Sequence, residues 1–276
     1  MKKIALVIMS FAIAVSAFAG GKKESGSVDK IKEAGSIRIG VFSDKAPFGY
    51  VDAEGEYQGY DVFFARRIAL DMLGSEDAVQ FVPVEAASRV EYLLSNKVDI
   101  ILANFTVTPE RAEAVDFALP YMKVALGIVS PDSEPITDIS QLDGKTLIVD
   151  KGTTAEIYFT KNYPNIKLLA FDQNTEALNA LKDRRGDALA HDNTFLFAWA
   201  IQNPGFTVTI DSIGSLDTIA PAVQKGNKTL LEWLNNEIKT GLGSTFFHED
   251  YNATLLPVYG DNVDPEAVVV ENGVVN

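Results

Sequence analysis

The side chains best suited to bind a small charged ligand stand together after a short apolar run, residues 100–103. Asn104 and Thr106 follow this run, and Arg111 comes a few residues later. The run predicts a strand, and Thr108 predicts the N-cap of the helix that follows it. Because open parallel sheets bind ligands beyond the carboxyl ends of their strands, this block predicts a polar ligand site.

Arg111 offers a planar guanidinium that can hold a carboxylate through two parallel hydrogen bonds. Pro109 is typical of the first position of a helix, which places Arg111 on the first turn, beside the strand end. The alternative is a surface arginine that pairs with Glu110 or Glu113. The sequence of this block leaves both roles open.

A second polar block follows the apolar residues 147–149. Gly152, Thr153 and Thr154 lead from that predicted strand into a helical pattern. Free backbone N–H groups and hydroxyls at such a junction form a cradle for an anion. The block lacks the pattern of a P-loop, which argues against a nucleotide. The threonines can also cap the helix, and the two roles are compatible.

Asp192 lies just after a third predicted strand, residues 187–190. A buried carboxylate there needs a cation as its partner, and the ammonium group of a ligand is one such cation. Adjacent residues of a strand point to opposite faces, so we interpret His191 as a packed residue and not as a general base. A nucleophilic serine pattern does not accompany them, and we predict no catalytic residue. Arg111 and Asp192 together would match the two charges of a free α-amino acid.

Short β-branched or aliphatic runs alternate with helical patterns along the chain, which favours an α/β protein with largely parallel sheets. The predicted strands cover residues 37–41, 79–84, 100–103, 126–130, 146–149, 166–170 and 187–190. The predicted helices cover residues 60–73, 88–95, 154–162, 175–184 and 228–241. Asp61 is expected to be the N-cap of the first of these helices.

Two segments of the chain are similar in residue type. Residues 93–100 and 181–188 each run from a helix end through a turn to an aspartate and a short apolar strand. Asn104 and Asp192 lie at equivalent offsets after these aspartates. This internal echo predicts two lobes that face one cleft. The alternative is that any two units of a strand and a helix look alike.

The echo also indicates where the lobes begin and end. We predict that residues 28–122 and 221–276 form lobe 1 and that residues 123–220 form lobe 2. The chain would then cross between the lobes twice, and two crossings make a hinge instead of a rigid joint.

The N-terminus predicts export. Residues 1–19 combine two lysines, an apolar run shorter than the roughly 20 residues of a membrane-spanning helix, and small residues at the positions that signal peptidase recognises. We predict a signal peptide that is cleaved after Ala19, followed by a flexible leader over residues 20–27. No cysteine follows the apolar run to carry a lipid, so a periplasmic location is expected.

Composition restricts the class of partner. The chain has 276 residues, of which 47% are hydrophobic, with no cysteine, two histidines and a formal net charge of −14. The apolar fraction and length are typical of a folded protein of one large or two medium domains. The negative charge argues against nucleic acid, and the lack of cysteine excludes disulfides and thiolate metal sites. We therefore expect no metal and no cofactor.

Several motifs together resemble the amino-acid-binding periplasmic proteins of ABC importers, which are family 3 of the bacterial extracellular solute-binding proteins. These motifs are residues 59–62 (GYDV), 98–111 (VDIILANFTVTPER), 152–154 (GTT) and 191–192 (HD). Residues 84–91 (VEAASRVE) and 121–127 (YMKVALG) resemble the cysteine-binding branch. The resemblance implies a two-lobed type II periplasmic-binding-protein fold, α/β in class, in which each lobe is a mostly parallel sheet flanked by helices.

The resemblance also implies roles for the polar residues. The arginine at the position of Arg111 grips the α-carboxylate of the ligand in this family. Its helpers are Thr106, Thr153 and Thr154. The aspartate at the position of Asp192 and the backbone at Asn104 hold the α-amino group.

The side-chain pocket departs from the pattern of many relatives. They place an acidic or aromatic residue where this chain has Phe42 and Lys45. Arg89 stands where binders of acidic amino acids have a second arginine. Neutralisation of Arg89 by Glu85 or Asp44 would suit a small neutral ligand.

The resemblance implies a non-catalytic binding protein that delivers a polar amino acid to an ABC permease in the inner membrane. We expect a monomer that binds L-cysteine. Cystine, glutamate or aspartate is the alternative ligand. The alternative classes are a dehydratase of the same fold, with Asp192, Glu85 or His191 as its acid, and a sensory or adhesive module.

Overall fold

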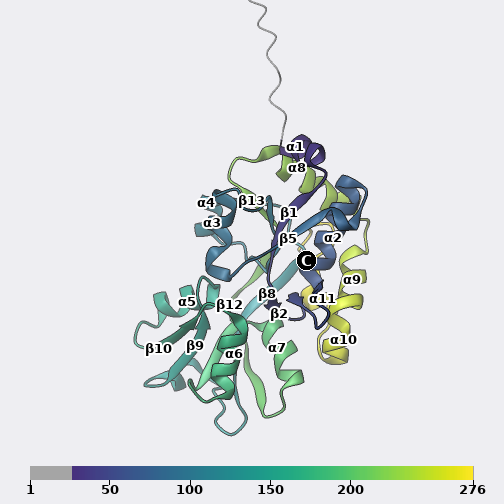
Figure 1. Ribbon diagram of the computed structural model, residues 1–276. Coiled ribbons are helices and arrows are strands. Elements are labelled where there is room, and N and C mark those ends of the chain that lie inside the picture. The colour runs from purple at the N-terminus through teal and green to yellow at the C-terminus, as the bar shows by residue number, and fades with distance from the viewer. Residues whose placement is uncertain (1–26, 276) are drawn as a thin grey trace, which may run out of the picture.

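The described residues of the computed structural model, 27–275, form two lobes, each built on a five-stranded sheet (Figure 1). In the first lobe the strand order is β5-β1-β6-β13-β7. These strands are β1 (Ile37–Val41), β5 (Val79–Pro83), β6 (Ile100–Ile101), β7 (Val115–Phe117) and β13 (Ala222–Gln224). The expected two-lobed α/β architecture is confirmed.

The sheet of the second lobe repeats this arrangement, with the strand order β10-β9-β11-β8-β12. Its strands are β8 (Met122–Pro131), β9 (Thr146–Asp150), β10 (Lys167–Phe171), β11 (Ala188–Asp192) and β12 (Phe206–Ile219). Each sheet has three parallel strands, then a strand antiparallel to both of its neighbours, and then an edge strand. The internal echo therefore reflects equivalent places in the two sheets, since β6 and β11 are the third strands.

The sheets are mixed, and the expectation of mostly parallel sheets is wrong in this detail. Two of the four strand pairings in each sheet are antiparallel. The cause lies in the crossings, because β8 and β13 are the first strands after the chain passes from one lobe to the other. Each enters its sheet from the side of the cleft and must run away from it, against the parallel strands that end there.

Helices cover both sheets (Figure 1). The first lobe carries α1 (Ser27–Ala34), α2 (Tyr60–Leu73), α3 (Arg89–Leu94), α4 (Pro109–Ala114) and α8 (Lys228–Asn236). The second lobe carries α5 (Thr154–Asn162), α6 (Asn174–Lys182) and α7 (Asn193–Gln202). A small antiparallel sheet of β2 (Asp44–Lys45), β3 (Gly49–Val51) and β4 (Tyr57–Gln58) precedes α2. The two helices predicted over residues 60–73 and 154–162 coincide with α2 and α5.

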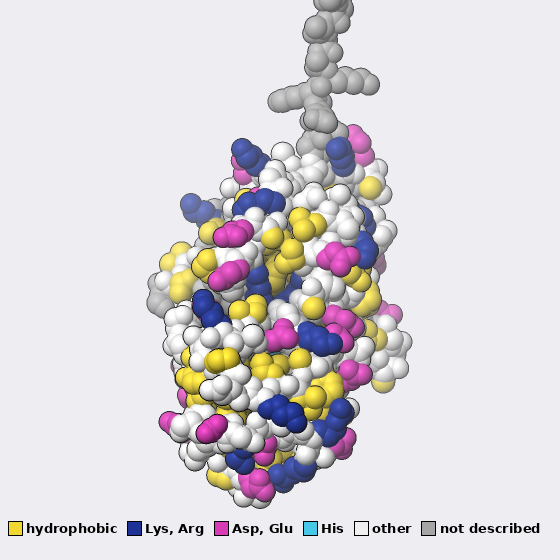
Figure 2. Space-filling model, turned by 90° about the vertical axis from the view of Figure 1, so that its left-hand side faces the viewer, with side chains coloured by type: hydrophobic (Ala, Val, Ile, Leu, Met, Phe, Trp, Pro, Cys, Tyr) yellow, Lys and Arg dark blue, Asp and Glu magenta, His cyan; other side chains and the backbone are white. Residues whose placement is uncertain are grey.

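The predicted signal peptide, residues 1–19, and residues 20–26 of the leader lie outside the described residues. Ser27 was expected to end the leader, but it begins α1 because its amide donates to Thr229 Oγ1 (3.1 Å) at the start of α8. Between residues 27 and 275, none of the helices is long and apolar enough to cross a bilayer. Charged side chains of both signs are scattered over the face shown in Figure 2.

The chain crosses between the lobes twice, as predicted, and the two crossings lie side by side. One joins β7 to β8 and the other joins β12 to β13. Tyr121 N donates to Ile219 O (3.0 Å), and Ala118 N donates to Pro221 O (2.9 Å). The hinge is therefore a short antiparallel ladder, which can twist while its hydrogen bonds are kept.

The C-terminal segment contacts both lobes. Its helices are α9 (Phe246–Asp250), α10 (Leu256–Tyr259) and α11 (Pro265–Val268). Beyond them, Val270 N donates to Tyr121 O (3.1 Å) at the hinge. Helix α9 packs on α2, whereas α10 packs on α7, where Tyr259 Oη donates to Thr194 O (2.8 Å). The tail was expected to return to the first lobe; strand β13 does so, and the final helices bridge the two lobes.

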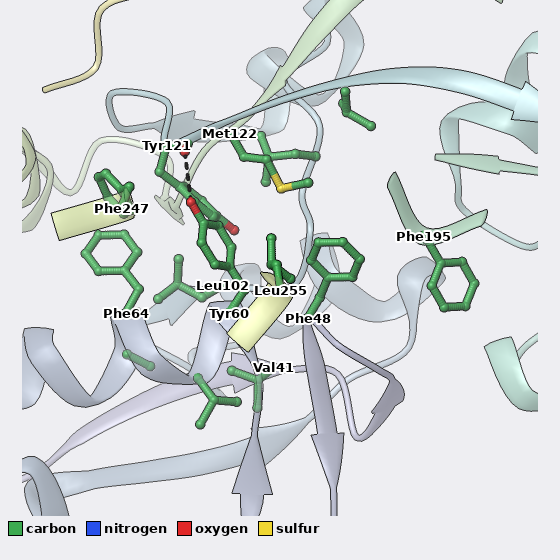
Figure 3. Close-up of a cluster of buried hydrophobic side chains, with 14 of the residues drawn as sticks. Val41, Phe48, Tyr60, Phe64, Leu102, Tyr121, Met122, Phe195, Phe247 and Leu255 are labelled. Carbon is green, nitrogen blue, oxygen red and sulfur yellow. Dashed lines mark hydrogen bonds between the residues drawn. The ribbon is translucent and has the colours of Figure 1, made fainter. Parts of the chain in front are cut away.

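Aromatic rings fill the core beside the hinge (Figure 3). Phe64 of α2 lies 5.5 Å from Tyr121 and 5.0 Å from Phe247, measured between ring centroids. The hydroxyl of Tyr60 points at the carbonyl of Tyr121. This cluster attaches the first crossing to both α2 and the C-terminal segment.

Replacement of Phe64 by alanine is expected to lower the free energy of unfolding by about 3–5 kcal/mol, because its fully buried ring would leave a cavity. Urea denaturation would measure the loss. Phe63 on the same helix is 36% exposed, so Phe63→Ala is a matched control with an expected loss below about 1.5 kcal/mol. Equal losses in the two variants would contradict this account of the core.

Candidate functional site

A small cavity lies between the lobes, at the carboxyl ends of β6 and β11. All eight side chains that the sequence predicted for the ligand site line it, together with two more. The lining residues are Phe42, Lys45, Arg89, Asn104, Thr106, Arg111, Thr153, Thr154, His191 and Asp192. A larger hollow at the other end of the first sheet is lined mostly by polar residues and by none of these.

Arg111 is buried, and its guanidinium joins the two lobes. Nη1 donates to Thr106 O (2.8 Å) in its own lobe, and Nη2 donates to Gly152 O (2.9 Å) in the other. The guanidinium also lies 4.7 Å from the centre of the Phe105 ring. Among the ion pairs of residues 27–275, none joins Arg111 to a glutamate. The alternative of a paired surface arginine is therefore wrong.

Arg89 is buried beside Arg111 and is held by carbonyl oxygens. Nε donates to Ala86 O, Nη1 to Ala103 O and Asn104 O, and Nη2 to Gly152 O, at 2.9 to 3.2 Å. Burial lowers the pKa of Arg89 well below its ordinary value, and the charge of Arg111 lowers it further. Two guanidinium groups thus share one acceptor, the carbonyl of Gly152.

The expected neutralisation of Arg89 by Glu85 or Asp44 is wrong. Asp44 accepts instead from Asn174 Nδ2 (2.9 Å) and from Thr175 N (3.3 Å), at the start of α6 in the second lobe. Asp44 therefore caps a helix across the cleft. Carbonyl oxygens and not a carboxylate hold the guanidinium of Arg89, so neither acidic residue neutralises it.

Asp192 has a protein cation as its partner. Lys45 Nζ of the first lobe lies 3.0 Å from Asp192 Oδ2, and both side chains are more than nine-tenths buried. Burial tends to raise the pKa of Asp192, but the charge of Lys45 and its hydrogen bond, with His191, keep that pKa below its ordinary value. The carboxylate is therefore ionised. Lys45 of the first lobe therefore stands where the sequence suggested the ammonium of a ligand.

His191 is a buried neutral imidazole. Its Nδ1 accepts from Asp192 N (2.6 Å), and its Nε2 lies 3.4 Å from Asp150 Oδ2. Burial, with the charge of Lys45, lowers the pKa of His191 to about 3. The interpretation of His191 as a packed polar residue agrees with this environment. However, His191 and Asp192 line the same cavity, so the argument that they face opposite sides was wrong.

The anion cradle at Gly152 is partly filled by the chain itself. Thr153 caps α5: its hydroxyl donates to Asp150 O (2.6 Å) and accepts from Glu156 N (3.3 Å). Gly152 N donates to Glu156 Oε2 (2.7 Å), so this amide is not the free donor that the sequence predicted. Thr154, which begins α5, also lines the cavity.

Asn104 lines the cavity and carries a buried acceptor without a partner among the described residues. Its backbone has a left-handed φ of 42°, and its Oδ1 is buried with no hydrogen-bond partner among the described residues. Asn104 N donates to Asp61 Oδ2 (2.9 Å), and Tyr121 Oη donates to Asp61 Oδ1. The buried carboxylate of Asp61 thus holds the end of β6 and the hinge residue Tyr121 in place. Its expected role as the N-cap of α2 is wrong, because the helix begins at Tyr60.

Comparison with known proteins identifies the family. Residues 37–243 match the family model of the bacterial extracellular solute-binding proteins, family 3. The chain belongs to this family. The glutamine-binding protein GlnH of an ABC transporter from Bacillus subtilis is 32% identical over 255 residues, which cover 87% of this chain and 92% of the relative.

Two solved structures are more similar to this family 3 protein. The solute receptor for L-cysteine from Neisseria gonorrhoeae is 62% identical, with a TM-score of 0.87 over 88% of this chain and 99% of the receptor. The cysteine-binding protein from Campylobacter jejuni is 57% identical, with a TM-score of 0.88 over 90% of this chain and all of the other. Both confirm the type II fold of this solute-binding protein.

The lobes of this solute-binding protein are in close contact at Gly152. An added Cβ there would lie 2.5 Å from Ala87 Cα, in the first lobe. Gly152→Ala is therefore expected to hold the cleft open and to weaken ligand binding by at least about tenfold. Ligand titration and the radius of gyration would measure the two effects.

Gly144→Ala is the matched control, because Gly144 has the same φ of 73° but no atom within 4 Å of an added Cβ. Both variants carry the backbone strain of alanine at positive φ, and only Gly152→Ala carries the clash across the cleft. Equal effects on binding in the two variants would contradict the proposed closure.

The buried carboxyl of Asp150 predicts a pH dependence of stability. Burial raises its pKa to about 7, a rise that the charge of Lys45 opposes in part. A raised pKa in the folded state means that stability from this group is lost as the pH rises from about 4 to about 7. Asp150→Asn is therefore expected to be more stable than the wild type at about pH 8, by a few kcal/mol, and closer to it at about pH 5.

Urea denaturation at both pH values would test this, with the exposed Asp143→Asn as control. The same difference between Asp150→Asn and wild type at both pH values would show that the carboxyl does not titrate in this range.

Proposed function

We propose that this protein is the extracytoplasmic substrate-binding component of an ABC importer and that it binds a free amino acid, L-cysteine, between its two lobes. One observation carries the proposal: Arg111 of the first lobe and Asp192 of the second line one buried cavity. Their opposite charges match the carboxylate and ammonium groups of an amino acid. The similarity to two cysteine-binding structures supports the choice of L-cysteine.

The proposed pose follows from the lining residues. The ligand carboxylate accepts from the guanidinium of Arg111, with Thr106 and Thr154 at its sides. The ammonium group donates to Asp192 and to Asn104 Oδ1, the acceptor without a partner among the described residues. Charge-assisted hydrogen bonds contribute about 1.5–3 kcal/mol each, so four or five of them reach the roughly 8 kcal/mol of micromolar binding after the cost of association.

Lobe closure would couple binding to transport. The ligand contacts both lobes, so it stabilises the closed form over any open one. We propose that the closed form docks on a permease of the inner membrane and that the protein acts as a periplasmic monomer. The formal net charge of −14 supports a partner other than nucleic acid.

We propose binding without catalysis. Of the three candidate acids, His191 is neutral because of its lowered pKa, and Asp192 is ionised beside Lys45. Glu85 is exposed and does not line the cavity. None of them is placed to donate a proton to a substrate in the cleft, as a dehydratase needs.

A thermal-shift screen of the twenty amino acids and cystine, under reducing and oxidising conditions, would test the ligand. Cysteine at a hundredfold excess over Kd is expected to stabilise the protein by about 2.7 kcal/mol, which raises Tm by several degrees. A larger shift in Tm with cystine or glutamate than with cysteine would show that this other compound is the ligand. No shift with any amino acid would overturn the proposal.

Asp192→Asn should abolish the shift, because the amide cannot balance the ligand ammonium. The variant leaves Lys45 buried without its partner, so circular dichroism would check that it is folded at the temperature of the assay. Asp172→Asn is the control, since Asp172 is exposed and pairs with Lys151 away from the cavity. A shift that survives in Asp192→Asn would remove Asp192 from the site.

A further inference from the structure

Lys45 lines the cavity although no part of the proposed pose uses it. Its side chain is 1% exposed, and its ammonium has one hydrogen bond among the described residues, to Asp192. Three aromatic rings surround the ammonium, at 5.1 to 5.8 Å from their centroids. These rings belong to Phe42, Phe48 and Phe195. A lysine ammonium has three donors, and only one of them is used by the described residues, so two remain for a group bound in the cavity that Lys45 lines.

The ligand side chain would meet positive charge. Once Arg111 holds the ligand carboxylate and Asp192 its ammonium, the remaining charged groups of the lining are Lys45 and Arg89. Within residues 27–275, Lys45 has Asp192 as its one ion-pair partner, and Arg89 has no carboxylate partner but is held by carbonyl oxygens. The part of the cavity left for the ligand side chain is therefore lined by two cations and the ring of Phe42.

We propose that Lys45 is a selectivity-determining residue of this site: its ammonium holds the Asp192 carboxylate in place for the ligand ammonium and excludes amino acids with a positively charged side chain. This inference rests on the proposed function and deepens it by naming a ligand class, neutral or acidic side chains.

The ion pair acts only when the lobes meet. Lys45 belongs to β2 and Asp192 to β11, so opening of the cleft separates them and hydrates both charges. In the closed form, the ion pair with Lys45 keeps the Asp192 carboxylate ionised. The positive charge of Lys45 then also lies close to the ligand side chain. Like charges in such a desolvated space repel strongly.

The test compares cysteine with β-aminoalanine, which has nearly the same shape but an amino group in place of the thiol. Isothermal titration would give both affinities for wild type and Lys45→Met. The wild type is expected to bind cysteine and to discriminate against β-aminoalanine. In Lys45→Met, cysteine affinity should fall at least about tenfold, because Asp192 is left buried without its partner. The ratio of the two affinities should fall by at least about tenfold as well.

Lys239→Met is the control, since Lys239 is exposed and lies outside the cavity. Lys45→Arg keeps the charge and should retain the discrimination even if its fit is poorer. The ratio of affinities separates selectivity from a general loss of folding, which would weaken both ligands alike.

Two results would overturn the inference. One is an unchanged ratio in Lys45→Met, and the other is tighter binding of cysteine in Lys45→Met, which would show that Lys45 competes with the ligand ammonium. If the wild type binds no amino acid, the proposed function fails first. If it binds cysteine and Lys45→Met behaves as wild type, only the role of Lys45 fails.

Discussion

The structure depends on how charges that are buried between two lobes find partners. Lys45 and Asp192 come from different lobes and neutralise each other at 3.0 Å. Arg89 and Arg111 both reach across to one carbonyl, that of Gly152. Each of these charged groups would be costly to bury without a partner. Closure of the lobes supplies the partners, and the resulting contacts in turn stabilise the closed arrangement.

Much of the fold and the cavity could be predicted because both depend on short stretches of sequence. The alternation of apolar runs and helical patterns located most of the strands of both sheets, and the echo placed Asn104 and Asp192 at equivalent strand ends. A strand end and the helix after it position their side chains locally. For that reason the residues of the cavity could be named without knowing how the lobes pack.

The partners of those residues could not be predicted, because they come from the other lobe. Glu85 is near Arg89 in sequence, but carbonyl oxygens hold the guanidinium. Two elements were also missed for local reasons. Strand β12 begins with an alternating pattern over residues 206–210 (FTVTI) that could have predicted it, but three changes of register against β8 break the pattern farther along the strand. Helix α7 is buried on most sides, so its sequence has no amphipathic pattern to find.

The C-terminal segment limits how far the hinge can open. Val269 forms a bridge with Met122, and Val270 bonds to Tyr121, so a third stretch of backbone runs along the two crossings. Tyr259 fastens the same segment to α7 of the second lobe. The C-terminal segment therefore connects the hinge to the second lobe. The lobes can separate only as far as this segment allows. The C-terminal segment therefore limits how far the cleft can open, as do the two crossings themselves.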